Sequence, residues 1–74
     1  MKAYTNKYSF LKGYGQVMNK DVDEVRRRIM EALNISSTQG FRYRLIGRYE
    51  PKASEKEAIE AIFNEYGITD IWGS

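Results

Sequence analysis

The middle of the chain, residues 33–51, runs Leu33-Asn34-Ile35-Ser36-Ser37-Thr38-Gln39-Gly40-Phe41-Arg42-Tyr43-Arg44-Leu45-Ile46-Gly47-Arg48-Tyr49-Glu50-Pro51. A helix needs partners for its first free N–H groups and its last free carbonyls. Ser36 and Gln39 have the spacing of a capping box, which supplies such partners where a helix starts. Gly47 suits the left-handed conformation that ends a helix, and Pro51 disfavours its resumption. The stretch therefore predicts a short helix over residues 37–46.

The two sides of this predicted helix differ in chemistry. Phe41 and Leu45 are four residues apart, so they share the face that we expect to pack on the rest of the domain. The other side is expected to present Gln39, Arg42, Tyr43 and Ile46, with Thr38, Arg44 and Arg48 on its flanks. Amide, guanidinium and phenol groups can reach base edges and phosphates. Gly40 is unfavourable inside a helix, by about 1 kcal/mol relative to Ala.

Two further helices are predicted by apolar residues that recur every three or four positions. Before the central stretch the pattern is Val22, Val25, Ile29 and Leu33, with Asp21 and Glu24 at capping-box spacing, which predicts a helix over residues 21–34. After it the pattern is Ala58, Ile59, Ile62, Phe63 and Tyr66, with Ser54 and Glu57 as the box and Gly67 at the end. This second pattern predicts a helix over residues 55–66.

Aromatic residues alternate with lysines near the start of the chain. Tyr4, Tyr8, Phe10 and Tyr14 lie at even spacings, which favours an extended segment over residues 1–18. Three interpretations remain open: a disordered tail, a strand or hairpin that packs on the domain or pairs two subunits, and an arm laid along nucleic acid. Gly13 and Gly15 could form the turn of a hairpin, whereas alone they are very weak evidence for a phosphate loop.

The composition argues against catalysis. The 74 residues form one small domain and include neither histidine nor cysteine, so the usual general base, thiolate ligands and disulfides are all missing. The acidic residues occupy helix starts and polar helical faces, which explains them without an active site. We expect no enzyme, no metal site, no cofactor and no small-molecule substrate, and a core of this size would benefit from self-association.

The net charge of +2 is unevenly distributed. Residues 1–20 and 36–56 are basic, whereas residues 57–74 are acidic. Clustered positive charge indicates where a polyanion would bind. The chain has neither a signal-like apolar run nor 18 consecutive apolar residues, so we expect a soluble cytoplasmic protein without membrane contact.

Two features each allow two interpretations. Arg26, Arg27 and Arg28 spread around the helix predicted over residues 21–34, either as a solvated face, with Glu24 paired to Arg28, or as phosphate contacts. Trp72, close to the end of the chain, either covers the core together with Ile71 or stacks on a ligand.

Residues 33–72 resemble the Cro and phage-repressor type of helix-turn-helix regulator. Leu33-Asn34-Ile35-Ser36 matches the turn that this family usually writes as Leu-Gly-Val-Ser, and Gly47 with Pro51 matches its Gly-x-x-x-Pro. The helix from Ser54, its Gly67-Ile68 end and the close Asp70-Ile71-Trp72 follow in the family's order. The sequence departs from the pattern at Met30 and at Gly40. Only one clear helix, over residues 21–34, precedes the turn, where the family normally has two.

The resemblance implies that the helix over residues 37–46 enters the major groove of double-stranded DNA. It assigns base contacts to Thr38, Gln39, Arg42 and Tyr43, and phosphate contacts to Ser37, Arg44, Arg48 and Lys52. A homodimer on two half-sites would add the specificity that one module lacks.

The sequence thus predicts a mainly α protein, a three-helix or four-helix helix-turn-helix domain over residues 19–74. An extended or β-hairpin arm over residues 1–18 precedes it. The expected function is sequence-specific DNA binding in transcription regulation. The alternative is a small helical protein-interaction module that uses Tyr43, Ile46 and Tyr49.

Overall fold

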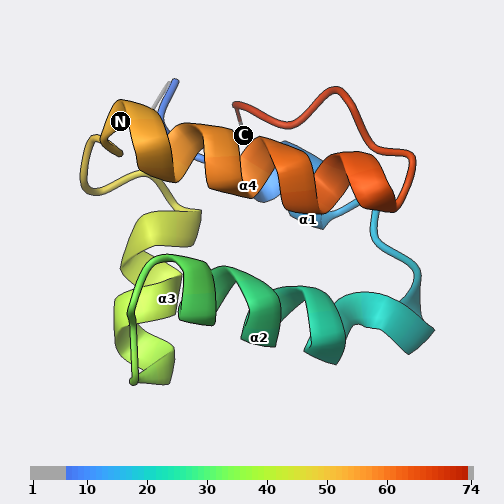
Figure 1. Ribbon diagram of the computed structural model, residues 1–74, viewed down its shortest axis with the longest axis horizontal. Coiled ribbons are helices and arrows are strands. Elements are labelled where there is room, and N and C mark those ends of the chain that lie inside the picture. Colours follow the sequence, from blue (N-terminus) through green and yellow to red (C-terminus); the bar gives the residue numbers. More distant parts are fainter. Residues whose placement is uncertain (1–6, 74) are drawn as a thin grey trace, which may run out of the picture.

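The computed structural model describes residues 7–73, which contain helices and no strand. The elements are α1 (Leu11–Tyr14), the 3-10 turn η1 (Asn19–Asp21), α2 (Val22–Ala32), α3 (Thr38–Leu45) and α4 (Ala53–Glu65). α2 and α4 pack side by side in opposite directions, and α3 bridges the end of α2 and the start of α4 (Figure 1). The mainly α class is confirmed. None of the described helices is long and apolar enough to cross a membrane.

The three predicted helices all form, with ends that differ by one or two residues from the predicted ones. The predicted apolar stripes form the core between α2 and α4. Val25 and Ile29 of α2 are fully buried, as are Ile59 and Phe63 of α4. Phe41 of α3 closes this core at one end, and Leu45 packs at its margin.

The helix starts differ from the capping boxes that the sequence predicts. Ser37, not Ser36, is the N-cap of α3, and its hydroxyl oxygen accepts a hydrogen bond from the Gly40 amide at 3.0 Å. Asp21 precedes α2 without a side-chain capping bond. α4 starts two residues early because the Glu55 carboxylate, rather than Glu57, accepts from the Lys52 amide at 2.9 Å. Neither Ser37 with Gly40 nor Lys52 with Glu55 matches the Ser/Thr-x-x-Glu/Gln pattern, so the capping-box rule could not have found these helix starts.

The helix ends follow the predicted motif. Gly47 has φ of 83°, and Arg48 donates its amide to the Tyr43 carbonyl at 2.9 Å. Asn34 takes the corresponding position after α2 with φ of 58°, and Ile35 donates to the Met30 carbonyl at 2.8 Å. Asparagine tolerates this left-handed conformation better than most residues other than glycine. The chain therefore turns tightly between α2 and α3.

The N-terminal segment differs most from the prediction. Within residues 7–18 the backbone forms α1 and turns, not an extended or β-hairpin arm, and residues 1–6 lie outside the described part. Phe10 is buried at the centre of the core, where its ring lies 6.1 Å from each of the rings of Phe41 and Phe63. The Gly13 amide donates to the Ile71 carbonyl at 3.0 Å, so α1 pairs with the end of the chain. Within the described residues, the aromatic side chains of Phe10 and Tyr14 pack on the core and do not lie on a strand.

Candidate nucleic-acid interface

The start of α3 is held by close packing around Gly40. A side chain at Gly40 would place its Cβ 2.9 Å from Ile35 Cγ2 and 3.1 Å from Ser37 Oγ. Ile35 is β-branched and stiff at χ1, so the methyl group cannot easily move away. The glycine that is unfavourable for the helix thus lets the turn after α2 lie directly against the first turn of α3.

The end of α3 is held by the N-terminal segment. The Leu45 carbonyl accepts hydrogen bonds from the Phe10 amide at 3.1 Å and from the Ser9 hydroxyl at 2.8 Å. Ser9 is completely buried, and its oxygen also accepts from the Leu11 amide at 3.1 Å. Both ends of α3 are therefore fixed to neighbouring segments, which keeps its outer face in one orientation.

The outer face carries an ordered polar and aromatic array. Gln39 donates from Nε2 to the Tyr43 hydroxyl at 2.6 Å, as their four-residue spacing allows. The Arg48 guanidinium lies 4.6 Å from the centroid of the Tyr43 ring, and the Tyr49 ring meets the same ring edge-on at 6.3 Å. The structure thus brings together three of the predicted site residues, Gln39, Tyr43 and Arg48. Tyr49 joins them from beyond the helix end.

Thr38 and Arg42 are exposed on the same helix. Residues 36–49 contain three arginines and no acidic residue. A dsDNA backbone carries one negative charge for each phosphate, and this segment adds no carboxylate that would repel it. Residues 36–49 carry a higher density of positive charge than the whole chain, whose net charge is only +2, so this segment suits a polyanion better.

Arg44 is placed differently from the other predicted site residues. Its guanidinium forms a two-bond pair with the Glu55 carboxylate, at 3.0 and 3.3 Å, and the two side chains are 22% and 19% exposed. Hydrogen bonds from Arg44 and from the Lys52 amide hold the pKa of Glu55 below its usual range. The pair ties α3 to the first turn of α4, so the Arg44 charge is already matched inside the domain.

The remaining two predicted phosphate contacts lie near the helix starts. Ser37 is exposed but its hydroxyl oxygen serves as the cap of α3. Lys52 is exposed directly before α4. The structure therefore leaves the Lys52 ammonium available at the edge of the α3 face and gives Ser37 a structural role.

The three arginines of α2 point to different surroundings. Arg28 pairs with Glu65 of α4 at 2.9 Å rather than with Glu24, which instead accepts from the Tyr66 hydroxyl at 2.8 Å. The predicted Glu24–Arg28 pair is therefore wrong, because Arg28 finds its partner on α4 and Glu24 finds its partner at Tyr66, directly after α4. The Glu65 hydrogen bond raises the pKa of Arg28, and the same bond lowers that of Glu65.

Arg26 and Arg27 lie beside α3. They line a shallow groove together with Met30, Glu31, Ile35, Ser36 and Thr38. Arg26 also pairs with the exposed Asp23 at 3.3 Å. The groove therefore brings two arginines of α2 close to the residues that lead into α3.

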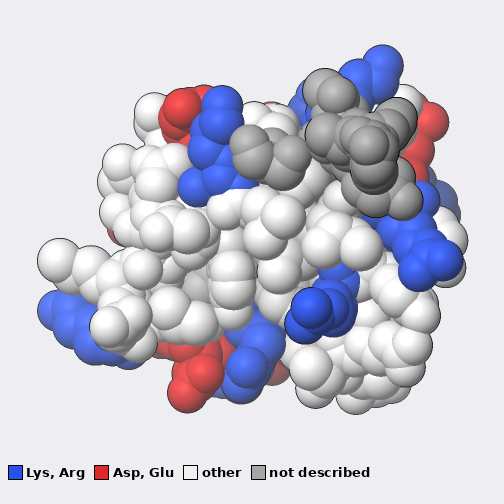
Figure 2. Space-filling view, turned by 180° about the vertical axis from the view of Figure 1, so that it is seen from behind, with Lys and Arg blue, Asp and Glu red and all other residues white. Residues whose placement is uncertain are grey.

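Figure 2 shows the molecule from behind the view of Figure 1. Lys and Arg side chains are spread over this face, some beside acidic groups, with uncharged areas between them. Within residues 7–73 no group of three or more acidic side chains could hold a metal ion. The arrangement on α3 is suited to non-covalent recognition through arginine, amide and phenol groups.

Comparison with protein-family models, with curated proteins and with solved structures finds no match to this chain. The assignment of a function therefore rests on the α3 face and its surroundings.

Proposed function

We propose that this protein is a DNA-binding regulator of the helix-turn-helix type that places α3 in the major groove. The observation that carries the proposal is the outer face of α3, where Gln39, Tyr43 and Arg48 form one array beside the exposed Arg42. The fixed ends of α3 support it, because a recognition helix must present its side chains in a constant orientation. The tight turn between α2 and α3 is also what such a motif requires.

The proposed contacts divide into two kinds. In this proposal the exposed Arg42 would read a guanine through its bidentate guanidinium, and Thr38, Gln39 and Tyr43 would contact neighbouring base edges. Arg48 and Lys52 would bind phosphates on one side of the helix, and Arg26 or Arg27 on the other. Arg44 is left out because Glu55 already holds it.

One domain of this size makes few base contacts. A second copy on an adjacent half-site would double them and match a two-fold symmetric operator. The proposal therefore includes a homodimer on DNA.

The test is fluorescence-anisotropy binding to a randomised duplex pool at two salt concentrations, with sequencing of the retained DNA. We expect a motif to be enriched, with affinity that falls steeply as salt rises. Arg42→Ala should abolish the enrichment at one position and weaken binding to the selected site by roughly 1–3 kcal/mol, which is about 5-fold to 150-fold. Lys20→Ala is the control, since Lys20 lies in η1 at the opposite end of α2 from α3.

Binding without an enriched motif would mean that the protein binds DNA only through a basic surface, without reading its sequence. Absence of binding at low salt would refute it. Equal losses for Arg42→Ala and Lys20→Ala would show that α3 does not read bases.

The exposed apolar surface after α3 favours a second candidate, a protein-interaction module. Ile46 is 38% exposed and Tyr49 is 54% exposed, next to Tyr43. Tyrosine and arginine are common at protein interfaces. In that case affinity for the partner would depend little on salt, and Ile46→Ala would weaken it more than Arg48→Ala.

A further inference from the structure

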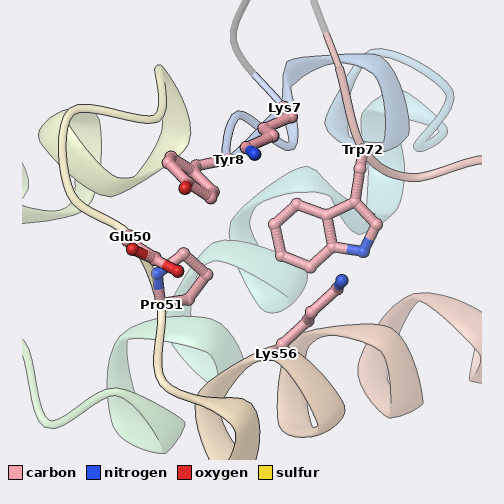
Figure 3. Close-up of a pocket in the computed structure, with 6 residues that line it drawn as sticks. All are labelled: Lys7, Tyr8, Glu50, Pro51, Lys56 and Trp72. Carbon is pink, nitrogen blue, oxygen red and sulfur yellow. The ribbon is translucent and has the colours of Figure 1, made fainter.

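A pocket of about 260 Å³ lies between the two ends of the described chain, the connector that follows α3 and the start of α4. Its lining residues come from three segments: Lys7, Tyr8, Glu50, Pro51, Lys56 and Trp72. Figure 3 shows the six-membered ring of Trp72 directed into this space, with Tyr8 and Pro51 on the opposite side and the Lys56 ammonium beneath the indole. The pocket thus combines aromatic walls with charged side chains.

The indole wall is fixed in place. Trp72 donates from Nε1 to the Glu60 carboxylate at 2.7 Å, and the Phe10 ring meets it edge-on at 6.0 Å. The next residue, Gly73, donates its amide to the Ser9 carbonyl at 2.7 Å and accepts from the Lys12 amide at 3.1 Å. Because the ring is already fixed, the Trp72 side chain loses little conformational entropy when a flat ligand packs against it.

The charges in the pocket are those that an anion beside an aromatic ring would need. The Lys56 ammonium lies 5.7 Å from the centroid of the indole, and the Lys7 ammonium lies 5.3 Å from that of Tyr8. Two ammonium groups next to two rings suit a ligand that joins a planar ring system to a phosphate. Glu50 adds one carboxylate to the same lining, which can accept hydrogen bonds only from a ligand that carries donors.

We propose that this pocket binds a nucleotide. The base packs between Tyr8 and Trp72, the phosphate binds Lys56 and Lys7, and Glu50 accepts a hydrogen bond from the exocyclic amine of the base. A phosphorylated tyrosine would supply a ring and a phosphate but no donor for Glu50, whose charge would then repel it. The same chemistry occurs in a free mononucleotide and in an unpaired nucleotide of a single strand.

The chain offers a direct probe of this site, because Trp72 is its only tryptophan. Titration of the full chain with adenosine 5′-monophosphate should quench the tryptophan fluorescence saturably, and calorimetry should give the same dissociation constant. Adenosine or inorganic phosphate alone should bind at least tenfold more weakly, because each lacks one half of the ligand. Uridine 5′-monophosphate, which has no exocyclic amine, should bind several-fold more weakly than the adenine nucleotide, and Glu50→Gln should reduce that preference.

Lys56→Gln should weaken nucleotide binding about tenfold, the size expected for one charge-assisted contact. Lys20→Gln removes the same charge from η1, outside the pocket, and should leave binding unchanged. Tyr8→Leu should weaken binding as well, while circular dichroism verifies that each variant is folded. Equal affinity for adenosine and its monophosphate, equal effects of the two lysine variants, or tighter binding of phosphotyrosine would each overturn the proposal.

Two further experiments identify the source of the nucleotide and distinguish this pocket from the DNA-binding face of α3. A 5′-phosphorylated single-stranded oligonucleotide that binds more tightly than the mononucleotide would identify an unpaired strand as the source, and the reverse order would identify a free nucleotide. Arg42→Ala should leave mononucleotide binding unchanged, because Arg42 does not line this pocket. The nucleotide site can therefore fail while duplex recognition by α3 holds, or the reverse.

Discussion

Ser36 and Ser37 are adjacent and chemically identical, yet only one of them caps α3. Ser37 has extended backbone angles, φ of −119° and ψ of 149°, and its hydroxyl oxygen faces the Gly40 amide. An N-cap residue needs both features, because its backbone lies outside the helix while its side chain replaces a missing acceptor. Which serine satisfies them depends on how Gly40 packs against Ile35, which is a contact that spacing rules do not contain.

Substitution of the two serines should separate them. Ser37→Ala is expected to lower the free energy of unfolding by about 1 kcal/mol, because the Gly40 amide loses its acceptor. Ser36→Ala should change it by less than about 0.5 kcal/mol, as for most exposed positions. Urea unfolding followed by circular dichroism measures both values. A larger loss for Ser36→Ala would place the cap one residue earlier than in the structure.

At the scale of side-chain contacts, the sequence predicts what is local. The contact between Gln39 and Tyr43 follows from their spacing on one helix. The pairing of Arg44 with Glu55 does not, since a turn and a connector separate the two and only the folded chain brings them together. The sequence therefore assigned Arg44 to a phosphate, whereas the structure gives it a partner on α4.

At the scale of elements, the Arg44–Glu55 pair links α3 to α4 and should make stability depend on pH. The pKa of Glu55 is lowered in the folded protein, so this carboxylate stabilises the fold above its ordinary pKa of 4.5. The contribution is lost as the pH falls from that value through the lowered folded pKa. Glu55→Gln should cost about 1–2 kcal/mol at neutral pH.

The difference between wild type and Glu55→Gln should shrink as the pH falls below 4.5. Urea unfolding at a series of pH values measures it. Glu65, whose pKa is also lowered, is present in both proteins, so its effect cancels in the comparison. A difference that stays constant through this range would show that Glu55 acts by shape and not by charge.

Arg44→Gln should likewise lower stability while leaving the salt dependence of DNA binding unchanged.

The long helices were predictable because each carries an apolar stripe with helical period, and α2 and α4 bury those stripes against each other. α1 was not predictable, because its four residues include Gly13 and have neither a side-chain N-cap nor an apolar stripe. Its conformation depends on hydrogen bonds from Lys12 and Gly13 to Gly73 and Ile71, at the far end of the chain. A helix that exists only through tertiary contacts leaves no local signal in the sequence.

For the molecule as a whole, the two ends of the described chain meet and close the core. Ser9 and Phe10, near the start of the described chain, contribute to both candidate sites. They fix the end of α3 through the Leu45 carbonyl, and they position the segment that carries Trp72. Residues 7–18 are thus part of the domain rather than an arm attached to it. Both the α3 face and the pocket beside Trp72 depend on this segment.

Phe10 provides the test of that closure. It is 1% exposed, and its ring contacts those of Phe41, Phe63 and Trp72 at 6.0–6.1 Å. Phe10→Ala should cost about 3–5 kcal/mol, as for other buried phenylalanines, which is most of the stability available to a domain of this size. The unfolding midpoint, followed by Trp72 fluorescence and by circular dichroism, should fall steeply or the variant should be unfolded.

Leu11→Ala is the matched control, since Leu11 is the next residue but is 38% exposed, and it should cost less than about 1 kcal/mol. Equal and small losses for the two variants would mean that the segment is peripheral to the core. A large loss confined to Phe10→Ala would instead establish that the N-terminal segment completes the core. The predicted boundary at residue 19 would then divide a single cooperative unit, and α3 could not be studied apart from the residues that hold it.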